Sequence, residues 1–134
     1  MRKFYNKVKP FLVPIITTLM IVILFHTVFM LGYVPTRSME PTLESGSLIL
    51  GFRLYDKLKK GDIIIFRHED SYLVKHIAAV EGDIVEHNGI RKTVPNDSFY
   101  VLVDNPAHSY DSRYWEKPFI SNDDVMAKVI LPSS

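Results

Sequence analysis

Residues 62–94 read DIIIFRHEDSYLVKHIAAVEGDIVEHNGIRKTV, and this stretch decides the fold class. Short runs rich in β-branched and aromatic residues alternate in it with turn signals, which is typical of strands. Asn88-Gly89 separates two such runs and favours a type I′ turn, because both central residues of that turn need positive φ. The stretch therefore predicts an antiparallel hairpin preceded by two further strands.

The same strand pattern continues on both sides of this stretch. It recurs at residues 48–52, 99–103 and 125–131, and no long amphipathic helix pattern interrupts it. Residues 104–124 carry no strand pattern, which favours a loop that carries function. We therefore predict a mainly β fold for residues 34–134, a coiled or barrel-like antiparallel domain.

An apolar, uncharged run at residues 11–33 precedes this domain. As a helix it would reach about 35 Å, enough to cross a bilayer. A cleaved secretory signal has a shorter apolar region and a small-x-small cleavage site, and neither feature fits here. We therefore predict one transmembrane anchor at 11–33 behind a basic cytoplasmic tail at 1–10. The basic tail places the amino terminus inside the cell membrane and the β domain outside it.

Composition and charge exclude several other classes of protein. The 134 residues leave room for one compact domain beside the anchor. From Val34 onward, 12 Lys and Arg face 15 Asp and Glu, so nucleic acid is not an expected partner. The chain has no cysteine, and its five histidines lack the spacing of metal ligands. No metal site and no organic cofactor are expected.

A proline-bracketed serine directly follows the apolar run, where residues 33–43 read YVPTRSMEPTL. Proline fixes its own φ and restricts the residue before it, so Pro35 and Pro41 would hold Ser38 in one orientation close to the lipid. Thr36 could present its hydroxyl, together with the Ser38 backbone N–H, to an oxyanion. Val34 and Pro35 are candidate walls of a substrate pocket. An ordinary surface loop is the competing interpretation.

Lys75 lies in the predicted strand 72–80, where its same-face neighbours Leu73, Ile77 and Ala79 are all apolar. Burial favours the neutral form of a lysine, which can then act as general base to a serine. The alternative is an edge lysine that reaches water. Together with Ser38, this lysine predicts a serine/lysine site.

The loop at 104–124 offers groups that could support such a site. Ser109 and Ser112 could accept hydrogen bonds from the lysine. Asp111 and Arg113 could instead form a structural ion pair. Tyr114 and Trp115 either pack the loop onto the sheet or dip into the membrane interface.

Four motifs in this order resemble the type I signal peptidases, membrane serine proteases of family S26 that remove signal peptides from exported proteins. Residues 38–43 resemble the nucleophile motif and 61–66 the conserved strand. Residues 74–77 followed by Gly82-Asp83 resemble the general-base motif, and 104–115 the last motif. The resemblance covers nearly the whole chain, and the short chain is similar to the Gram-positive form.

The resemblance implies the role of each site residue. These are Ser38 as nucleophile, Lys75 as general base, Thr36 as oxyanion donor, Ser109 as the group that orients the lysine, and Asp111 with Arg113 as a supporting pair. It implies neither metal nor cofactor. The expected partners are the lipid bilayer and secretory preproteins cut at Ala-x-Ala-like sites. Whether these serve general secretion or are a dedicated set such as pilus subunits is left open.

The chain departs from the family pattern at several positions. Val103 replaces the usual Gly, His76 the usual Arg after the base and Glu81 the usual Pro, while residues 106–108 differ from the usual polar connector. None is the nucleophile or the base, which indicates a divergent subtype. A non-cleaving membrane assembly factor on the same fold is the alternative function. A self-cleaving repressor is a third, but a membrane run here takes the place of its DNA-binding domain.

Overall fold

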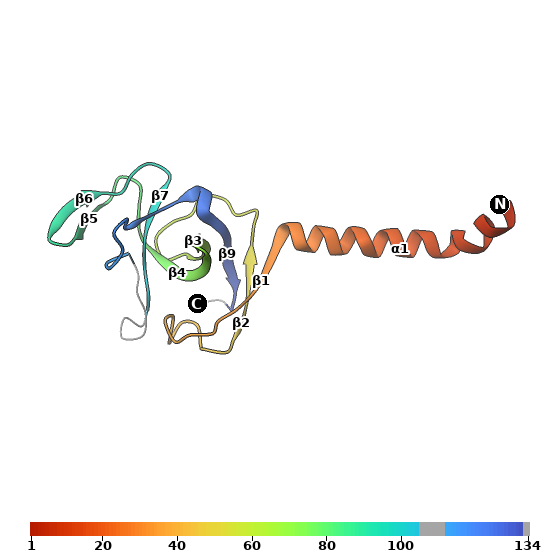
Figure 1. Ribbon diagram of the computed structural model, residues 1–134, viewed down its shortest axis with the longest axis horizontal. Coiled ribbons are helices and arrows are strands. Elements are labelled where there is room, and N and C mark those ends of the chain that lie inside the picture. The colour runs from red at the N-terminus through yellow and green to blue at the C-terminus, as the bar shows by residue number, and fades with distance from the viewer. Residues whose placement is uncertain (105–111, 133–134) are drawn as a thin grey trace.

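The computed structural model describes residues 1–104 and 112–132, which form one long helix and an outer domain of strands (Figure 1). Helix α1 runs from Arg2 to Val28, and none of its residues is buried. Its most apolar window has a mean hydropathy of 2.4, so by length and composition this helix can cross a membrane.

The apolar run of the sequence divides at Val28 into a helix and a strand. Residues after Val28 form strand β1 (Phe29–Tyr33), which pairs antiparallel with β2 (Leu48–Phe52) along its whole length. The Arg53 N–H donates to the Val28 carbonyl at 2.7 Å, which satisfies an otherwise open group at the helix end. The backbone N–H and C=O groups of β1 therefore form hydrogen bonds with β2, in place of the bonds that a longer helix would have supplied.

Within residues 1–104 and 112–132, seven strands form one sheet in the order β1-β2-β9-β3-β4-β7-β8, and β5 and β6 form a separate hairpin. All the pairings are antiparallel, which confirms the mainly β, antiparallel prediction. Asn88 and Gly89 both have positive φ at the hairpin turn, as predicted. The remaining elements are β3 (Ile63–His68), β4 (Ser71–Val80), β5 (Ile84–His87), β6 (Ile90–Thr93), β7 (Ser98–Leu102), β8 (Phe119–Ser121), the 3-10 turn η2 (Asn122–Asp124) and β9 (Val125–Leu131).

Two features of the sheet differ from the sequence-based expectation. Within the described residues the sheet is open, because β1 pairs only with β2 and β8 only with β7, so the barrel-like closure is not formed. In addition, β8 lies inside residues 104–124, where no strand pattern was found. It is too short to show alternation, and it forms because Ile120 pairs with Phe99 of β7.

The centre of the sheet is buried on both faces. Ile63 and Ile65 of β3 belong to one apolar cluster, whereas Ile64 and Phe66 belong to a second cluster on the opposite face. Side chains that alternate along a strand point to opposite faces, so β3 is buried on both faces, and its neighbour β4 is buried on the face that carries Lys75, Ile77 and Ala79. This arrangement places the strand that carries Lys75 in the core.

Candidate active site

The loop that carries Ser38 is closed at its base and pinned to the core. Gly46 donates its N–H to the Val34 carbonyl at 2.7 Å, and the Val34 N–H donates to the Ser47 carbonyl at 3.0 Å. Met39 follows Ser38 directly and is fully buried in the cluster that contains Ile63 and Ile65. The serine therefore sits on a fixed segment, and the residue is only 6% exposed.

Thr36 places its hydroxyl next to that of Ser38. The two Oγ atoms are 3.1 Å apart, a hydrogen bond in which either can be the donor. Thr36 itself lies at the surface. This contact does not test the predicted role of Thr36 as an oxyanion donor, which stays a prediction.

Lys75 is buried in the middle of the sheet, with 3% of its surface exposed. Its strand, β4, lies between β3 and β7, and Lys75 pairs with Ile64, which is fully buried. Ile77 on the same face is 1% exposed. The alternative of an edge lysine that reaches water is therefore wrong, and the predicted burial among apolar neighbours is confirmed.

Ser38 and Lys75 belong to a small set of buried polar side chains. In the part of the chain that the structure describes, this set consists of Ser38, Lys75, His87 and Ser112. Ser112 is fully buried; its Oγ accepts from the Val101 N–H at 3.1 Å, and its own N–H donates to the Val101 carbonyl at 3.2 Å. It thereby ties the last motif to β7, the strand beside β4.

His76 connects the strand of Lys75 to the start of the last motif. Its Nδ1 lies 2.6 Å from Oδ1 of Asp104, close enough for an ion pair, although the approach does not meet hydrogen-bond geometry. About a quarter of the His76 side chain is exposed (27%), and the Asp104 side chain is 18% exposed. Nothing in the sequence spacing of His76 and Asp104 predicts that the two residues meet.

The family model described as signal peptidase, peptidase S26, matches residues 8–91 and 88–133, nearly the whole chain. The chain belongs to this peptidase family. A curated relative, the probable signal peptidase I-2 of Synechocystis sp., is 28% identical over an alignment that covers 74% of this chain and 60% of the relative. The chain thus spans about three fifths of the length of the relative it matches.

The Gly82-Asp83 pair, which ends the predicted general-base motif, is a structural turn. Gly82 has a φ of +85°, which favours glycine. The Asp83 carboxylate accepts from the Val80 N–H at 2.9 Å and pairs with Lys60 at 3.0 Å. The Val80 hydrogen bond, and then Lys60, hold the pKa of Asp83 below its ordinary value. The turn fixes the end of the strand that carries Lys75.

The remaining predicted site residues are only partly placed. Ser109 and Asp111 lie outside the described residues, so their roles stay predictions. Arg113 is exposed, and its Cζ lies 5.7 Å from the ring centre of Tyr114. Val34 is 3% exposed within the core, whereas Pro35 is exposed, and a substrate contact for either one also stays a prediction.

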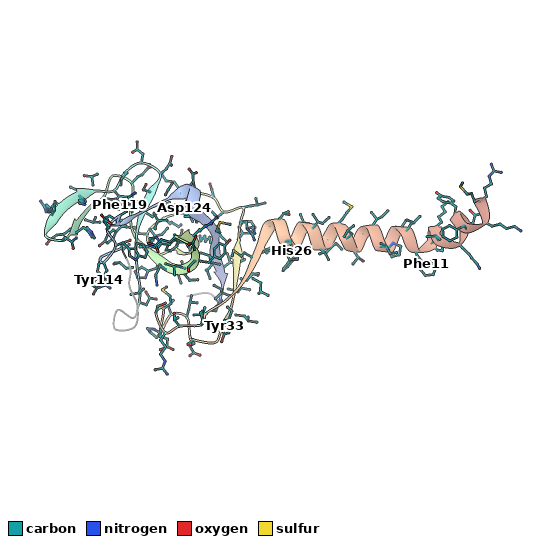
Figure 2. All side chains as sticks on the ribbon, viewed as in Figure 1. Phe11, His26, Tyr33, Tyr114, Phe119 and Asp124 are labelled. Atoms are coloured by element: carbon teal, nitrogen blue, oxygen red, sulfur yellow. The ribbon has the colours of Figure 1, made fainter. Side chains whose placement is uncertain are left out.

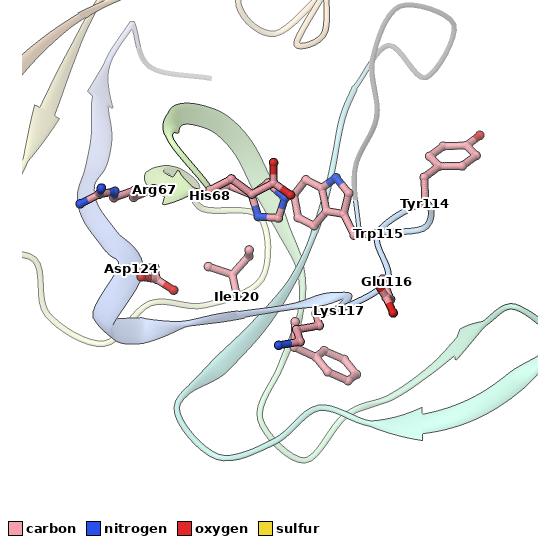
Figure 3. Close-up of a pocket in the computed structure, with 10 residues that line it drawn as sticks. Arg67, His68, Tyr114, Trp115, Glu116, Lys117, Ile120 and Asp124 are labelled. Atoms are coloured by element: carbon pink, nitrogen blue, oxygen red, sulfur yellow. The ribbon is translucent and has the colours of Figure 1, made fainter.

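A pocket of about 790 Å³ has neither Ser38 nor Lys75 in its lining. The His68 ring stacks on Trp115 there, with the ring centres 4.1 Å apart (Figure 3). Trp115 also meets Phe66 edge-on. Trp115 therefore packs its segment onto the sheet, one of the two alternatives left open by the sequence.

Proposed function

We propose that this chain is a membrane-anchored serine endopeptidase that cleaves signal peptides from exported preproteins with a Ser38/Lys75 dyad. The supporting observation is that both residues are almost fully buried, at 6% and 3% exposure, in a member of a peptidase family. Burying a lysine is unfavourable, so such a residue is rarely kept without a role.

In the proposed mechanism, neutral Lys75 takes the proton of the Ser38 hydroxyl while Oγ attacks the scissile carbonyl carbon. The Thr36 hydroxyl and the Ser38 backbone N–H donate to the oxyanion that forms. Collapse of this intermediate breaks the C–N bond, and the protonated lysine passes its proton to the leaving amine. Water, activated by the same lysine, then hydrolyses the acyl-enzyme.

The surroundings of Lys75 support its role as the base. Desolvation among Ile64 and Ile77 favours the neutral amine, which is the form that accepts a proton. In this proposal Ser109 orients the amine, and Asp111 with Arg113 supports the segment that carries it.

The anchor supports the choice of substrate. We expect preproteins to enter as extended chains beside a free sheet edge and to present small side chains at the cut. Holding enzyme and substrate in one membrane raises their effective concentration. In this topology the amino terminus lies in the cytoplasm and the outer domain beyond the cell membrane. General secretory precursors and pilus-type precursors are the two substrate sets to compare.

The test is cleavage of purified precursors by the full chain in detergent micelles. Ser38→Ala and Lys75→Ala are each expected to abolish cleavage. Lys128→Ala is the matched control, because Lys128 of β9 also pairs with Ile64. Its side chain is a third exposed (33%), and its Nζ lies 3.4 Å from Oδ1 of Asp62. Ser45→Ala, an exposed serine of the Ser38 loop, is the second control.

The outcomes distinguish the proposed dyad protease from the non-cleaving assembly factor. Loss in both dyad variants with activity kept in both controls supports the proposal. An unchanged rate in Lys75→Ala rejects the dyad. If the wild-type chain cleaves none of several precursors from either set, the non-cleaving assembly factor becomes the better function.

A further inference from the structure

The turn between β5 and β6 takes no part in the candidate site, and its sequence is Asn88-Gly89. Both residues are exposed, and both have positive φ, at +54° and +75°. A Cβ atom added to Gly89 would meet no atom within 4 Å apart from its chain neighbours. The peptide bond between the two residues therefore lies in open space, where water reaches it.

An asparagine followed by glycine can react with its own backbone. The Gly89 nitrogen attacks Cγ of Asn88, so a bond forms between these two atoms and the Cγ–Nδ2 bond breaks. The proton lost by the Gly89 N–H leaves with Nδ2 as ammonia. The product is a five-membered succinimide ring, which water opens at either carbonyl to give aspartate or β-linked isoaspartate. Glycine favours the closure, because it has no Cβ to crowd the ring and restricts the backbone least.

His87, directly before the turn, places its ring beside the nitrogen that must leave. Its Nε2 lies 3.3 Å from Nδ2 of Asn88, a contact in which the amide N–H donates to the ring. The residue is only 3% exposed, and in the described part of the chain its Nδ1 has no hydrogen-bond partner. When protonated, a ring in this position can give a proton to the departing nitrogen, as general acids do.

The hairpin is fixed at its base but is paired only with itself beyond the base. Gly82 donates its N–H to the Val94 carbonyl at 3.0 Å, and the Val94 N–H donates to the Asp83 carbonyl at 2.8 Å. Among residues 1–104 and 112–132, β5 and β6 pair with no other strand. A two-stranded ladder is marginally stable by itself, so it opens locally near the turn while the base holds. Such opening gives Asn88 the backbone rotation that ring closure requires.

We propose that Asn88 is a self-modification site, at which the side-chain amide is converted to aspartate or isoaspartate through a succinimide, with His87 assisting the loss of ammonia. The reaction puts a carboxylate in place of a neutral amide, beside the His87 ring. Isoaspartate also lengthens the backbone by one methylene group, within a turn whose conformation sets the pairing of β5 with β6. The modified chain therefore has one more negative charge and a changed hairpin tip.

The modification site lies far from the loop that carries Ser38. The β5–β6 hairpin projects on the side of the outer domain opposite to α1 (Figure 1). Tyr33, which precedes the Ser38 loop, lies in the half of the outer domain nearest α1 (Figure 2). We therefore expect the modification to leave the proposed cleavage unchanged, and neither proposal depends on the other.

The test uses the full chain in detergent micelles, held near neutral pH at body temperature and sampled over time. Proteolytic peptides are analysed by mass spectrometry for the mass gain of an amide-to-acid exchange, and isoaspartate is measured with an isoaspartyl methyltransferase. Asn96 is the internal control, because it is exposed and precedes Asp97, which also has positive φ (+52°) but carries a side chain.

Three variants complete the design. Gly89→Asn adds a Cβ in open space and uses a residue that accepts positive φ. His87→Phe keeps a ring at the buried position but removes both nitrogens. His87→Gln keeps a polar side chain that cannot become charged, and it replaces His87→Phe if that variant melts at a lower temperature.

We expect conversion at Asn88 to be at least about fivefold faster than at Asn96, the factor that corresponds to the greater backbone freedom of glycine. Gly89→Asn should slow conversion at Asn88 by a similar factor. Both His87 variants should slow it at least about twofold, as for the loss of one hydrogen bond to the leaving group.

Equal conversion at Asn88 and Asn96 in the wild-type chain, or none at Asn88, overturns the proposed site. A Gly89→Asn chain that converts as fast as the wild type overturns it as well. An unchanged or faster rate in a folded His87 variant overturns the role of His87. The readout is the mass of a peptide, so a chain without peptidase activity gives the same answer.

Discussion

Replacing Thr36 by valine tests the candidate oxyanion site with the least disturbance to the fold. Valine keeps the shape of threonine but removes the hydroxyl whose Oγ lies 3.1 Å from that of Ser38. If this hydroxyl only positions Ser38, its loss removes one partly exposed hydrogen bond, about 0.5–1.5 kcal/mol. Because 1.4 kcal/mol corresponds to a factor of ten, the rate would fall by about tenfold at most.

Loss of an oxyanion donor has a much larger effect on the rate. Removing one such donor costs about 2.7–4 kcal/mol, which corresponds to about 100- to 1,000-fold in kcat. We therefore expect Thr36→Val to lose about 100-fold or more in kcat with KM little changed, since the donor acts on the transition state. Thermal unfolding should change little, because Thr36 lies at the surface.

The assay is steady-state cleavage of a peptide that carries the cut site, by the full chain in detergent. Thr36→Ser is the matched variant, since it keeps a hydroxyl at the same position and should retain most of the activity. A Thr36→Val enzyme within tenfold of the wild type would refute the oxyanion role. So would a Thr36→Ser enzyme as slow as Thr36→Val.

Three further predictions concern stability and topology. Asp83→Asn should lower the melting temperature at pH 7, because Val80 and Lys60 hold the pKa of the folded-state carboxyl below its ordinary value. The stabilisation by the ionised Asp83 is fully present above the pKa of the unfolded state, about 3.9, and is lost as pH falls through the lower pKa of the folded state. The difference in melting temperature between wild type and Asp83→Asn should therefore shrink below about pH 4. A difference that does not depend on pH would contradict this prediction. Gly51→Ala should destabilise the domain by about 1–3 kcal/mol in denaturant titrations, because the added Cβ would lie 2.8 Å from that of Ala127, and an unchanged midpoint would argue against this packing. Single cysteines placed in the basic tail at residues 1–10 and in the β5–β6 turn should react with a membrane-impermeant thiol reagent on intact cells only at the turn, and the opposite pattern would invert the proposed topology.

Local sequence patterns predicted much of the fold and part of the site. The period of two in residues 72–80 predicted a strand with Lys75 on its apolar face, because side-chain direction in a strand follows from sequence spacing alone. Asn88-Gly89 predicted the hairpin for a similar reason, since its turn requires a local backbone conformation. The proximity of Thr36 to Ser38 was also predictable, because the two residues are close in the chain.

The end of the apolar helix α1 was decided only by the tertiary structure. The residues of α1 and of β1 are similarly apolar, so hydropathy along the run at 11–33 does not mark where the helix ends and the strand begins. Pairing of β1 with β2, together with the Arg53 hydrogen bonds, fixes it at Val28. The open sheet and the short strand β8 likewise depend on which strands become neighbours.

The sequence by itself determined most of the strands, the apolar run of α1 and the order of the four motifs, because each depends on residues close together in the chain. The tertiary structure decided which distant residues meet. It placed Asp104 beside His76, tied Ser112 to Val101, and made β1 an edge strand of the sheet. These contacts join segments brought together by sheet pairing, and the energy of that pairing depends on the whole set of strands rather than on any one stretch.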